Sequence, residues 1–472
     1  MPHARPIGRL LSSALLGVLL TLAMAGPARA ADVYWGANIG SHLTGGSPPY
    51  DMTAADTFEG MVGKKMSIMH FVQAWNDCSK PVCAMRKFPV KEMEAIRQRG
   101  ALALFGWVSM TAPMTTGSYQ PDFQLRDVID GTYDAYIRQW AQDAKAWGHP
   151  FFMDLNPEMN LSSTWPYVEA RNDNRPGEYV KMWRHVHDIF RQEGVQNATW
   201  TWCANIEYPG SAPLAPLYPG DDYVDWTCLD GYNWHWGWKS PTEVFGSTYD
   251  KVQSIAPDKP MLIGETASTE RGGSKAKWIT DLYTKQLPER FPNVKGIVWY
   301  EKKDPLVTED PEGWLLESST ASLAAFKAAI GSPVFADPVF RDLPGTTIQP
   351  LSPLVKPKPG GSGGGSSSGG GGTGTAREAR LIATRAFALR PVATCLPRPA
   401  QLRVRYRRPA GMTVTALDAY VAGKRVVHRS GRDARRTFVL KRLPQGTFKL
   451  TIKIRTSAGK TGAIRRAYRV CA

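Results

Sequence analysis

Two glutamates follow mostly apolar segments of the chain, in positions where their carboxyl groups could act together. Glu158 comes after the run 151–155 and a short turn, and Glu265 directly follows the run 260–264. Cleavage of a glycosidic bond needs such a pair, because one carboxyl group must be protonated to assist the leaving oxygen and the other must be ionised to attack or to activate water. The alternative is that each glutamate is a solvated or salt-bridged group.

Both glutamates lie in a regular alternation of strand-like runs and amphipathic stretches. Apolar and β-branched runs predict eight strands, at Val33–Ile39, Met66–Gln73, Ala101–Val108, Phe151–Asn156, Ala198–Ala204, Val224–Tyr232, Pro260–Glu265 and Val294–Tyr300. Apolar residues at helical spacing predict helices at Asp122–Trp147, Pro176–Glu193, Ser274–Gln286 and Glu317–Ala329.

This alternation predicts an α/β fold, a (β/α)₈ TIM barrel. A doubly wound open sheet is the alternative, but such a sheet usually carries a glycine-rich phosphate loop after its first strand, and Gly36–Gly40 does not fit that pattern. In the barrel, Glu158 and Glu265 follow strands four and seven, at the carboxyl end where TIM-barrel enzymes place catalysis. That placement favours the close, retaining geometry, with carboxyl groups ~5–5.5 Å apart.

Several motifs between about residues 150 and 305 occur together in one family. They include Glu158-Met159-Asn160 followed by Trp165, and the stretches Trp200–Asn205, Leu229–Trp234 and Ile263–Ser268. The sequence resembles glycoside hydrolase family 26, a family of retaining barrel enzymes with β-mannanase and lichenase members. The match is dense over this region and weaker over residues 32–150.

The resemblance implies a role for each matched residue. Glu158 would be the acid/base and Glu265 the nucleophile. The substrate-binding residues that it implies are Asn160, Trp165, Asn205, Tyr232, Trp234 and Trp299. Tyr232 would lie beside the nucleophile, and the tryptophans would line the sugar cleft, because aromatic rings pack against the apolar C–H faces of sugars.

Two positions depart from the family's pattern. The histidine that precedes the acid/base is Pro157 here, and the basic residue three positions further back is Asp154. These groups help to orient the acid/base and the sugar, so the usual preference for mannan is in doubt while the two-glutamate chemistry is not. We expect a monomeric, endo-acting hydrolase of β-mannan or mixed-linkage β-glucan that works by double displacement on its polysaccharide substrate.

Two other functions stay open. The barrel could be a non-catalytic glycan-binding scaffold, or an enzyme that remodels glycans of the producer's own envelope. The sequence contains no zinc-protease, P-loop or calcium-loop motif, and the cysteines do not have the spacing of a zinc site. We therefore expect no cofactor and no metal.

The N-terminus predicts export. Arg5 and Arg9 precede the apolar stretch Leu10–Met24, and Ala28-Arg29-Ala30 is a small-x-small cleavage site, so residues 1–30 are typical of a secretory signal peptide. An uncleaved anchor helix is the alternative, but the apolar stretch is shorter than the ~20 residues that a membrane span needs. The mature protein is expected to be secreted, and possible association with the cell surface stays open.

Six cysteines fit an exported chain, because disulfides persist in oxidising compartments. Six cysteines allow ~15 pairings. Proximity along the sequence favours Cys78–Cys83, Cys203–Cys228 and Cys395–Cys471.

Composition divides the rest of the chain. Residues 31–331 form the predicted barrel, 332–375 a Pro-, Gly- and Ser-rich linker, and 376–472 a small all-β domain that resembles a β-sandwich. The net charge of the chain is +16, but residues 377–469 alone hold 24 Lys and Arg against three acidic residues, so the remainder is near −5. We expect the basic domain to adhere to an anionic cell wall or acidic glycan. A carbohydrate-binding module and a plain stalk are the alternatives, and nucleic acid is not expected as a partner of an exported protein.

Overall fold

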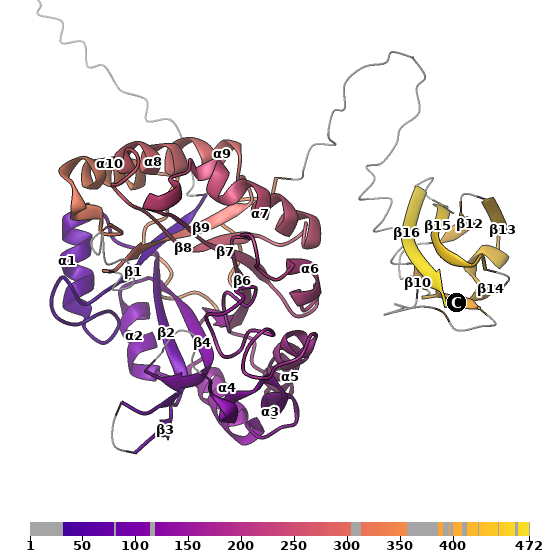
Figure 1. Ribbon diagram of the computed structural model, residues 1–472, viewed down its shortest axis with the longest axis horizontal. Coiled ribbons are helices and arrows are strands. Elements are labelled where there is room, and N and C mark those ends of the chain that lie inside the picture. The colour runs from indigo at the N-terminus through magenta and orange to yellow at the C-terminus, as the bar shows by residue number, and fades with distance from the viewer. Residues whose placement is uncertain are drawn as a thin grey trace, which may run out of the picture. The chain divides into compact units, whose positions relative to one another are not determined.

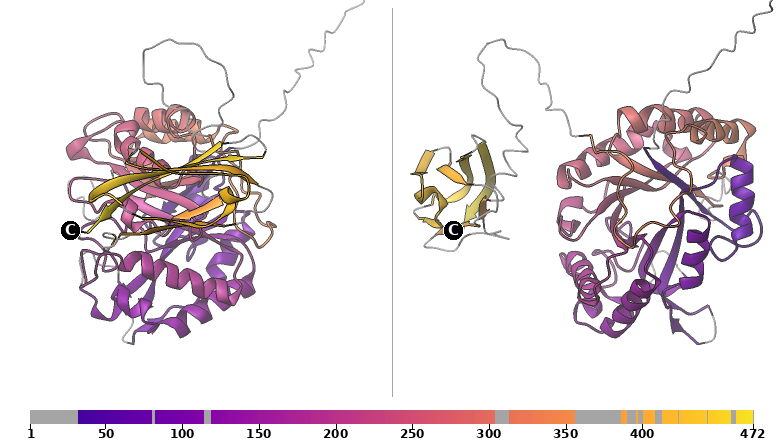
Figure 2. Two further views of the ribbon diagram at one scale, coloured as in Figure 1. Left: turned by 90° about the vertical axis from the view of Figure 1, so that its right-hand side faces the viewer. Right: turned by 180° about the vertical axis from the view of Figure 1, so that it is seen from behind.

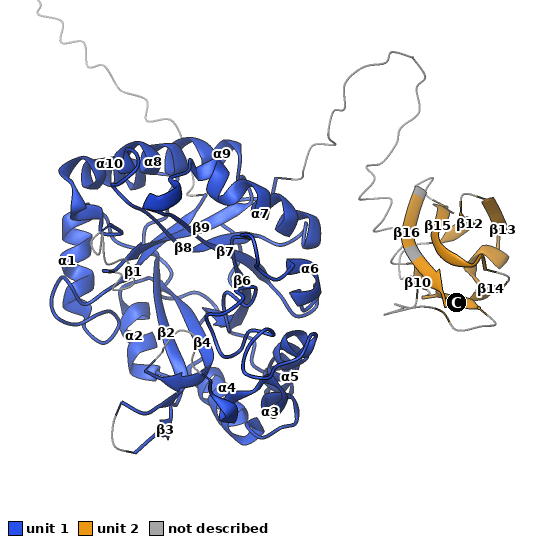
Figure 3. Cartoon of the chain, viewed as in Figure 1, with its two compact units in different colours: residues 1–356 blue, residues 357–472 orange. Residues whose placement is uncertain are grey.

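The computed structural model describes residues 32–79, 82–113, 119–303, 313–355, 386–389, 396, 400–407, 413–422, 424–441, 443–457 and 461–471. The chain divides into two compact units, Met1–Lys356 and Pro357–Ala472 (Figure 3). The predicted signal peptide and residues 356–375 of the predicted linker lie outside the described residues. In the part of the chain that the structure describes, no helix combines the length and the hydropathy that crossing a bilayer requires.

Unit 1 is built on parallel strands that close into a barrel (Figure 1). The strands are β1 (Tyr34–Ile39), β2 (Ile68–Asp77), β4 (Leu102–Ala112), β5 (Phe151–Leu155), β6 (Ala198–Asn205), β7 (Trp226–Asn233), β8 (Met261–Ser268) and β9 (Val294–Glu301). Each pairs with the next, and β9 pairs with β1 to close the ring. A two-residue strand, β3 (Ala84–Met85), adds antiparallel to β2. The predicted (β/α)₈ barrel is confirmed.

Helices cover the outside of the barrel (Figures 1 and 2). They are α1 (Met52–Val62), α2 (Val90–Gln98), α3 (Leu125–Ile129), α4 (Asp134–Trp147), α5 (Glu178–Glu193), α6 (Leu214–Leu217), α7 (Pro241–Ile255), α8 (Lys275–Asp281), α9 (Leu287–Glu289) and α10 (Thr320–Ile330). In α5 the buried residues Tyr179, Met182 and Val186 recur at helical spacing, so one apolar face packs against the strands.

Two predicted helices differ in the structure. The predicted helix 122–147 is divided into α3 and α4, because the chain turns at Gly131, whose φ of 88° lies in the left-handed region that glycine favours. The predicted helix 317–329 begins later, at α10. Ser319 caps α10 by accepting a hydrogen bond from the Ser322 amide, and a 3₁₀ turn, η4 (Leu316–Ser318), precedes it.

Residues 332–355 close the amino-terminal end of the barrel. Phe340 and Ile348 are buried with residues of the barrel interior. The indole N–H of Trp226, at the start of β7, donates to the Ile348 carbonyl (2.9 Å), and the Phe340 ring lies 5.1 Å from that of Tyr34 at the start of β1. The predicted linker begins at residue 332. The structure instead packs residues 332–355 against the barrel, because the apolar residues among the prolines fill its base.

Disulfides join Cys78 to Cys83 and Cys203 to Cys228, as predicted. Cys203 on β6 and Cys228 on β7 lie opposite each other in the strand pairing and are fully buried in the barrel interior. Paired residues of neighbouring strands face the same side of the sheet, which brings the two sulfurs together. The third predicted pair includes Cys395, which lies outside the described residues.

Unit 2 is all-β. One antiparallel sheet contains β10 (Phe387–Leu389), β11 (Leu402–Tyr406) and β14 (Phe438–Leu440), and another contains β13 (Lys424–Ser430), β12 (Val414–Val421), β15 (Gly446–Thr456) and β16 (Thr461–Val470). Val404 of the first sheet and Leu450 of the second belong to one buried core. Buried and exposed residues alternate along β15, as in a sheet with one face on a core. The predicted all-β C-terminal domain is confirmed.

Replacement of Cys203 and Cys228 by alanine should lower the free energy of unfolding of unit 1. The bond spans 25 residues of sequence, and release of that constraint on the unfolded chain corresponds to about 3 kcal/mol. Urea unfolding followed by tryptophan fluorescence measures the change. The Cys78→Ala/Cys83→Ala double variant, whose bond spans five residues, is the control and should lose about 2 kcal/mol. An equal or smaller loss at the buried pair would contradict the expectation.

Candidate active site

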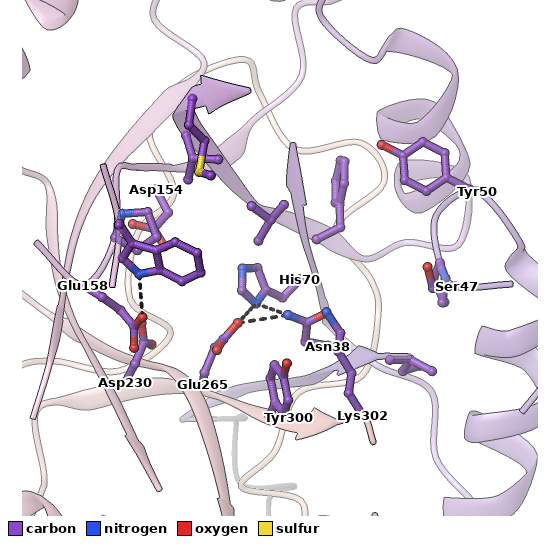
Figure 4. Close-up of a pocket in the computed structure, with 18 of the residues that line it drawn as sticks. Asn38, Ser47, Tyr50, His70, Asp154, Glu158, Asp230, Glu265, Tyr300 and Lys302 are labelled. Atoms are coloured by element: carbon purple, nitrogen blue, oxygen red, sulfur yellow. Dashed lines mark hydrogen bonds and ion pairs between the residues drawn. The ribbon is translucent and has the colours of Figure 1, made fainter. Parts of the chain in front are cut away.

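A cavity of about 220 Å³ opens at the carboxyl ends of the barrel strands (Figure 4). Its lining includes Asn38 of β1, His70 of β2, Asp154 of β5, Asp230 of β7, Glu265 of β8 and Tyr300 of β9. Glu158, from the loop after β5, also lines it. Both glutamates singled out from the sequence therefore face one cavity.

An extra residue in β8 accompanies the entry of Glu265 into this cavity. Ile263 is in register with β7, but the next pair along is Asp230 with Glu265, so Gly264 is additional. The pairing of β8 with β9 shifts at the same point. Such a bulge interrupts the alternation of a strand and re-aims a side chain. Gly264 suits the position because a Cβ there would lie 2.6 Å from Cys228 Sγ.

The turn after β5 carries Glu158 over the barrel. Asn156 and Glu158 have φ angles of 49° and 55°, in the left-handed region that residues other than glycine adopt rarely. The Glu158 amide donates to the Cys203 carbonyl on β6 (2.8 Å), and the Ser109 amide on β4 donates to Asn156 Oδ1 (2.8 Å). Hydrogen bonds to both neighbouring strands therefore hold this turn.

The Glu158 side chain is partly buried, and its carboxyl group accepts two hydrogen bonds. Trp165 Nε1 donates to Oε2 (2.9 Å), and Asn205 Nδ2 donates to Oε1 (2.6 Å). Burial and the nearby charge of Glu265 raise the pKa of Glu158 to about 7, and the two hydrogen bonds oppose this rise. Glu158 can therefore hold a proton near neutral pH, in a setting that also stabilises its ionised form.

Glu265 accepts hydrogen bonds from two other strands. Tyr232 donates its hydroxyl proton to Oε2, and Asn38 Nδ2 donates to Oε1 at 3.0 Å. His70 Nδ1 lies 3.3 Å from Oε1. Burial lowers the pKa of His70 to about 4, so its ring is neutral at physiological pH. Hydrogen-bond donors from β7 and β1 are therefore aimed at both carboxylate oxygens of Glu265.

Two further carboxyl groups line the same cavity. Asp154 and Asp230 are 2% and 3% exposed. Burial, followed by the charges of Glu265 and Glu158, raises the pKa of both aspartates well above the usual range. Among the residues that the structure describes, no partner hydrogen-bonds to Asp154 Oδ1. A protonated carboxyl group can donate as well as accept, so Asp154 offers a polar contact to an occupant of the cavity.

Three of the residues predicted to bind substrate contact the two glutamates. Trp165 and Asn205 donate to Glu158, and Tyr232 donates to Glu265. Trp165 also lines the cavity. The proximity predicted for Tyr232 and Glu265 is therefore present.

Asn160 and Trp234, also predicted to bind substrate, contact neighbours other than the two glutamates. Asn160 is fully buried and exchanges two hydrogen bonds with the backbone of Asn205, at 2.8 and 2.9 Å, so it positions the residue that contacts Glu158. Trp234 stacks on Trp236 with ring centroids 4.3 Å apart, and Trp236 is 68% exposed. This pair presents an aromatic surface to solvent, next to Tyr232.

Trp299 lies between the barrel and its helices, and the next residue lines the cavity instead. Trp299 is fully buried, donates its indole N–H to the Trp314 carbonyl (2.9 Å) and packs against Phe326 of α10. Tyr300 is the cavity residue. Successive strand residues face opposite sides, so the two side chains cannot both face the cavity. The same alternation in the sequence could have identified Tyr300.

Several polar residues of the site were not predicted from the sequence, including Asp230 of β7. Asn38 stands in an otherwise apolar strand, His70 has apolar neighbours on both sides in β2, and Lys302 follows the end of β9. A polar side chain near the carboxyl end of a buried strand is a usable signal, because burial of an unpaired polar group is unfavourable. Lys302 gave no such signal, since it follows the strand and is next to another lysine.

Part of the sequence is similar to known proteins. Residues 121–259 match the model of glycosyl hydrolase family 26. The chain is 31% identical over 288 residues to endoglucanase H of Acetivibrio thermocellus. This alignment covers 59% of this chain and 29% of that protein. It is 24% identical over 153 residues to mannan endo-1,4-beta-mannosidase A and B of Caldalkalibacillus mannanilyticus. This alignment covers 31% of this chain and 27% of that protein. The chain therefore spans less than a third of the length of these relatives.

Solved structures show distant likenesses. A double mutant of Cellulomonas fimi endo-beta-1,4-mannanase is 17% identical, over 93% of this chain and 94% of that chain, with a TM-score of 0.47. Another is a beta-mannanase from a symbiotic protist of the termite Reticulitermes speratus, complexed with gluco-manno-oligosaccharide. It is 14% identical over 66% of this chain and 90% of that chain, with a TM-score of 0.47.

The substitution Glu265→Gln should lower the pKa of Glu158 below about 7, because it removes the neighbouring negative charge that helps to raise this pKa. A ¹³C NMR titration of glutamate-labelled protein measures it, with Glu158→Gln to assign the signal. Glu289→Gln, at an exposed glutamate of α9, is the matched control and should leave the titration unchanged. An unchanged Glu158 titration in Glu265→Gln would show that the two groups do not interact.

Proposed function

We propose that the barrel belongs to glycoside hydrolase family 26, whose model matches residues 121–259, and that it hydrolyses internal β-glycosidic bonds of a polysaccharide by double displacement. The observation that carries the proposal is that Glu158 and Glu265 line one cavity and accept hydrogen bonds from different residues. Burial and repulsion raise the pKa of Glu158 to about 7, whereas a hydroxyl and an amide donate to Glu265. One group suits a proton donor and the other an ionised nucleophile.

The reaction has two steps. The Glu265 carboxylate attacks the anomeric carbon, and Glu158 gives its proton to the departing glycosidic oxygen, which leaves a glycosyl ester on Glu265. Glu158, now ionised, then takes a proton from water, whose oxygen attacks the same carbon and releases Glu265. Trp165 and Asn205 suit both steps, because their N–H groups stabilise Glu158 when it is ionised.

Mixed-linkage β-glucan is the favoured substrate, with β-mannan as the second candidate. The relative that aligns over 288 residues is named an endoglucanase, and the one named a mannosidase aligns over 153 residues. Asp154 and Pro157 stand where the family's mannan-cleaving pattern has a basic residue and a histidine. Asp154 therefore brings an acidic group into the cavity lining, where the common pattern has a basic one.

An exposed aromatic surface supports an extended substrate. Trp236 is 68% exposed and stacks on Trp234, whose ring lies 6.1 Å from that of Tyr232, the partner of Glu265. Sugar rings pack on such surfaces through their C–H faces. A chain bound in the cavity can continue onto this surface, which supports cleavage within a polymer.

The wild-type protein should release reducing sugar from mixed-linkage β-glucan or β-mannan in a panel that also contains xylans and galactans. Glu265→Ala should lower the rate by about 10⁴-fold or more, because the glycosyl ester cannot form. ¹H NMR should show the β-anomer of the product first, since two inversions restore the original configuration.

Glu289→Ala is the matched control and should keep full activity, because Glu289 is exposed on α9. Wild-type rates in a folded Glu265→Ala variant would overturn the assigned nucleophile. Initial release of the α-anomer would overturn double displacement. A folded wild-type protein that releases no sugar from the panel would favour a binding role or an envelope glycan as the ligand.

We further propose that the protein is secreted and that unit 2 adheres to an anionic glycan. Two disulfides among the described residues support an oxidising compartment. On β15, Lys449, Lys453 and Arg455 are exposed on the face away from the core. Arg425 of β13 shares this face, because Arg425 and Thr451 both pair with Tyr420 of β12. Such a face attracts anionic polymers.

Replacement of Lys449 and Lys453 by glutamate should weaken sedimentation of the full-length protein with an insoluble anionic polysaccharide. Binding should also fall as salt is raised, because exposed charges are screened. The Arg403→Glu/Arg405→Glu variant changes the same charge on β11 of the other sheet, where both arginines are exposed, and should bind more strongly than the β15 variant. Equal binding by both variants would assign no role to the β15 face.

A further inference from the structure

Three side chains from distant parts of the sequence converge beside the closure of the barrel. Glu301 is the last residue of β9 and pairs with Ile39 of β1, so His42, three residues further on, comes close to it. Glu317 reaches the same point from η4. His42 Nε2 lies 3.2 Å from Glu317 Oε1 and 3.8 Å from Glu301 Oε1, and one donor atom of each residue lies within 4.8 Å of the others.

The side chains of His42 and Glu301 are buried, yet the ring nitrogens of His42 lack hydrogen bonds to the described residues. The side chains of His42 and Glu301 are 6% and 0% exposed. Within the described part of the chain, neither ring nitrogen of His42 makes a hydrogen bond, and Glu317 Oε2 makes none. An unsatisfied polar group is costly to bury. The imidazole is therefore aimed at two carboxyl groups without the geometry of a hydrogen bond to either.

The spacing fits three ligands around one cation. Nitrogen and oxygen ligands bind Zn²⁺ at ~2.0–2.1 Å, so two ligands of a tetrahedral site lie roughly 3.3 Å apart. The two distances from His42 Nε2, 3.2 and 3.8 Å, are close to this value. Glu301 is also oriented from outside the cluster, because the Leu316 amide donates to both of its carboxylate oxygens at 3.2 and 3.1 Å. Such outer contacts commonly orient metal ligands.

We propose that His42, Glu301 and Glu317 form a site for a divalent transition-metal ion, with Zn²⁺ as the best fit. One imidazole and two carboxylates suit zinc, whereas magnesium and calcium prefer oxygen ligands alone. Two carboxylates balance the charge of the ion. Glu317, whose side chain is 31% exposed, marks the side open to water, which would supply the fourth ligand. The other convergent group, Cys203, Cys228 and Asp230, does not compete, because its sulfurs form a disulfide.

The site has a structural role. It joins the loop after β1, the end of β9 and η4. Trp314, three residues before Glu317, packs against Tyr232 with ring centroids 5.3 Å apart, and Tyr232 donates to Glu265. A bound ion would fix this segment behind the cavity without a contact to either glutamate of the candidate active site.

Calorimetric titration of the EDTA-treated, dialysed full-length protein with zinc chloride tests the proposal. We expect one ion per chain and a rise in the melting temperature of unit 1 on addition of zinc, because a ligand that binds only the folded state stabilises it. His42→Ala and Glu317→Gln should each weaken binding by about tenfold or more and abolish the thermal shift. Glu317 is partly exposed, so its variant keeps the test usable if His42→Ala is unstable.

His149→Ala is the matched control, because His149 lies just before β5, at the opposite end of the barrel, and should bind zinc as the wild type does. Absence of zinc binding by the wild type would overturn the site and leave an ion-paired histidine. Binding that survives in both folded variants would place the ion elsewhere and equally overturn the assignment. Parallel titrations with manganese and calcium chlorides test the preference for zinc.

Discussion

The candidate site depends on burial of four carboxyl groups in one cavity and on the electrostatic repulsion between them. Asp154, Glu158, Asp230 and Glu265 all line it, and a low-dielectric interior disfavours several negative charges at close range. Tyr232 and Asn38 donate hydrogen bonds to Glu265. Burial and the charge of Glu265 raise the pKa of each of the other three carboxyl groups. Surroundings, more than residue type, distinguish the two glutamates for which we propose the roles of acid and nucleophile.

Much of the fold could be predicted because the apolar strands and the α5 pattern are local signals. Glu158 and Glu265 could be located for the same reason, since each stands next to an apolar strand. The position of Trp299 could not be predicted from its type alone, because one step along a strand separates the cavity from the outer layer. Gly264 shows a further limit: a bulge is set by the pairing of three strands, and local composition does not report it.

Closure of the barrel explains the contacts that sequence analysis missed. Asn38 and His70 reach Glu265 only because β1 and β2 complete the ring that contains β8. The same closure brings His42 and Glu301 together, although 259 positions separate them in the sequence. No local motif can report such a pair. Residues 332–355 are a related case. Their apolar side chains can be buried only after the barrel has formed, because they pack against its base.

The buried disulfide has a consequence for how this protein can be made. Cys203 and Cys228 are fully buried in the barrel interior, in one apolar cluster with Phe340 and Ile348 of the segment that closes its base. An oxidant or disulfide exchange partner must reach both sulfurs, and the finished barrel gives it no path through that packing. We therefore expect this bond to form more readily before the interior is packed than after. A chain that completes its barrel in a reducing compartment would acquire the bond slowly.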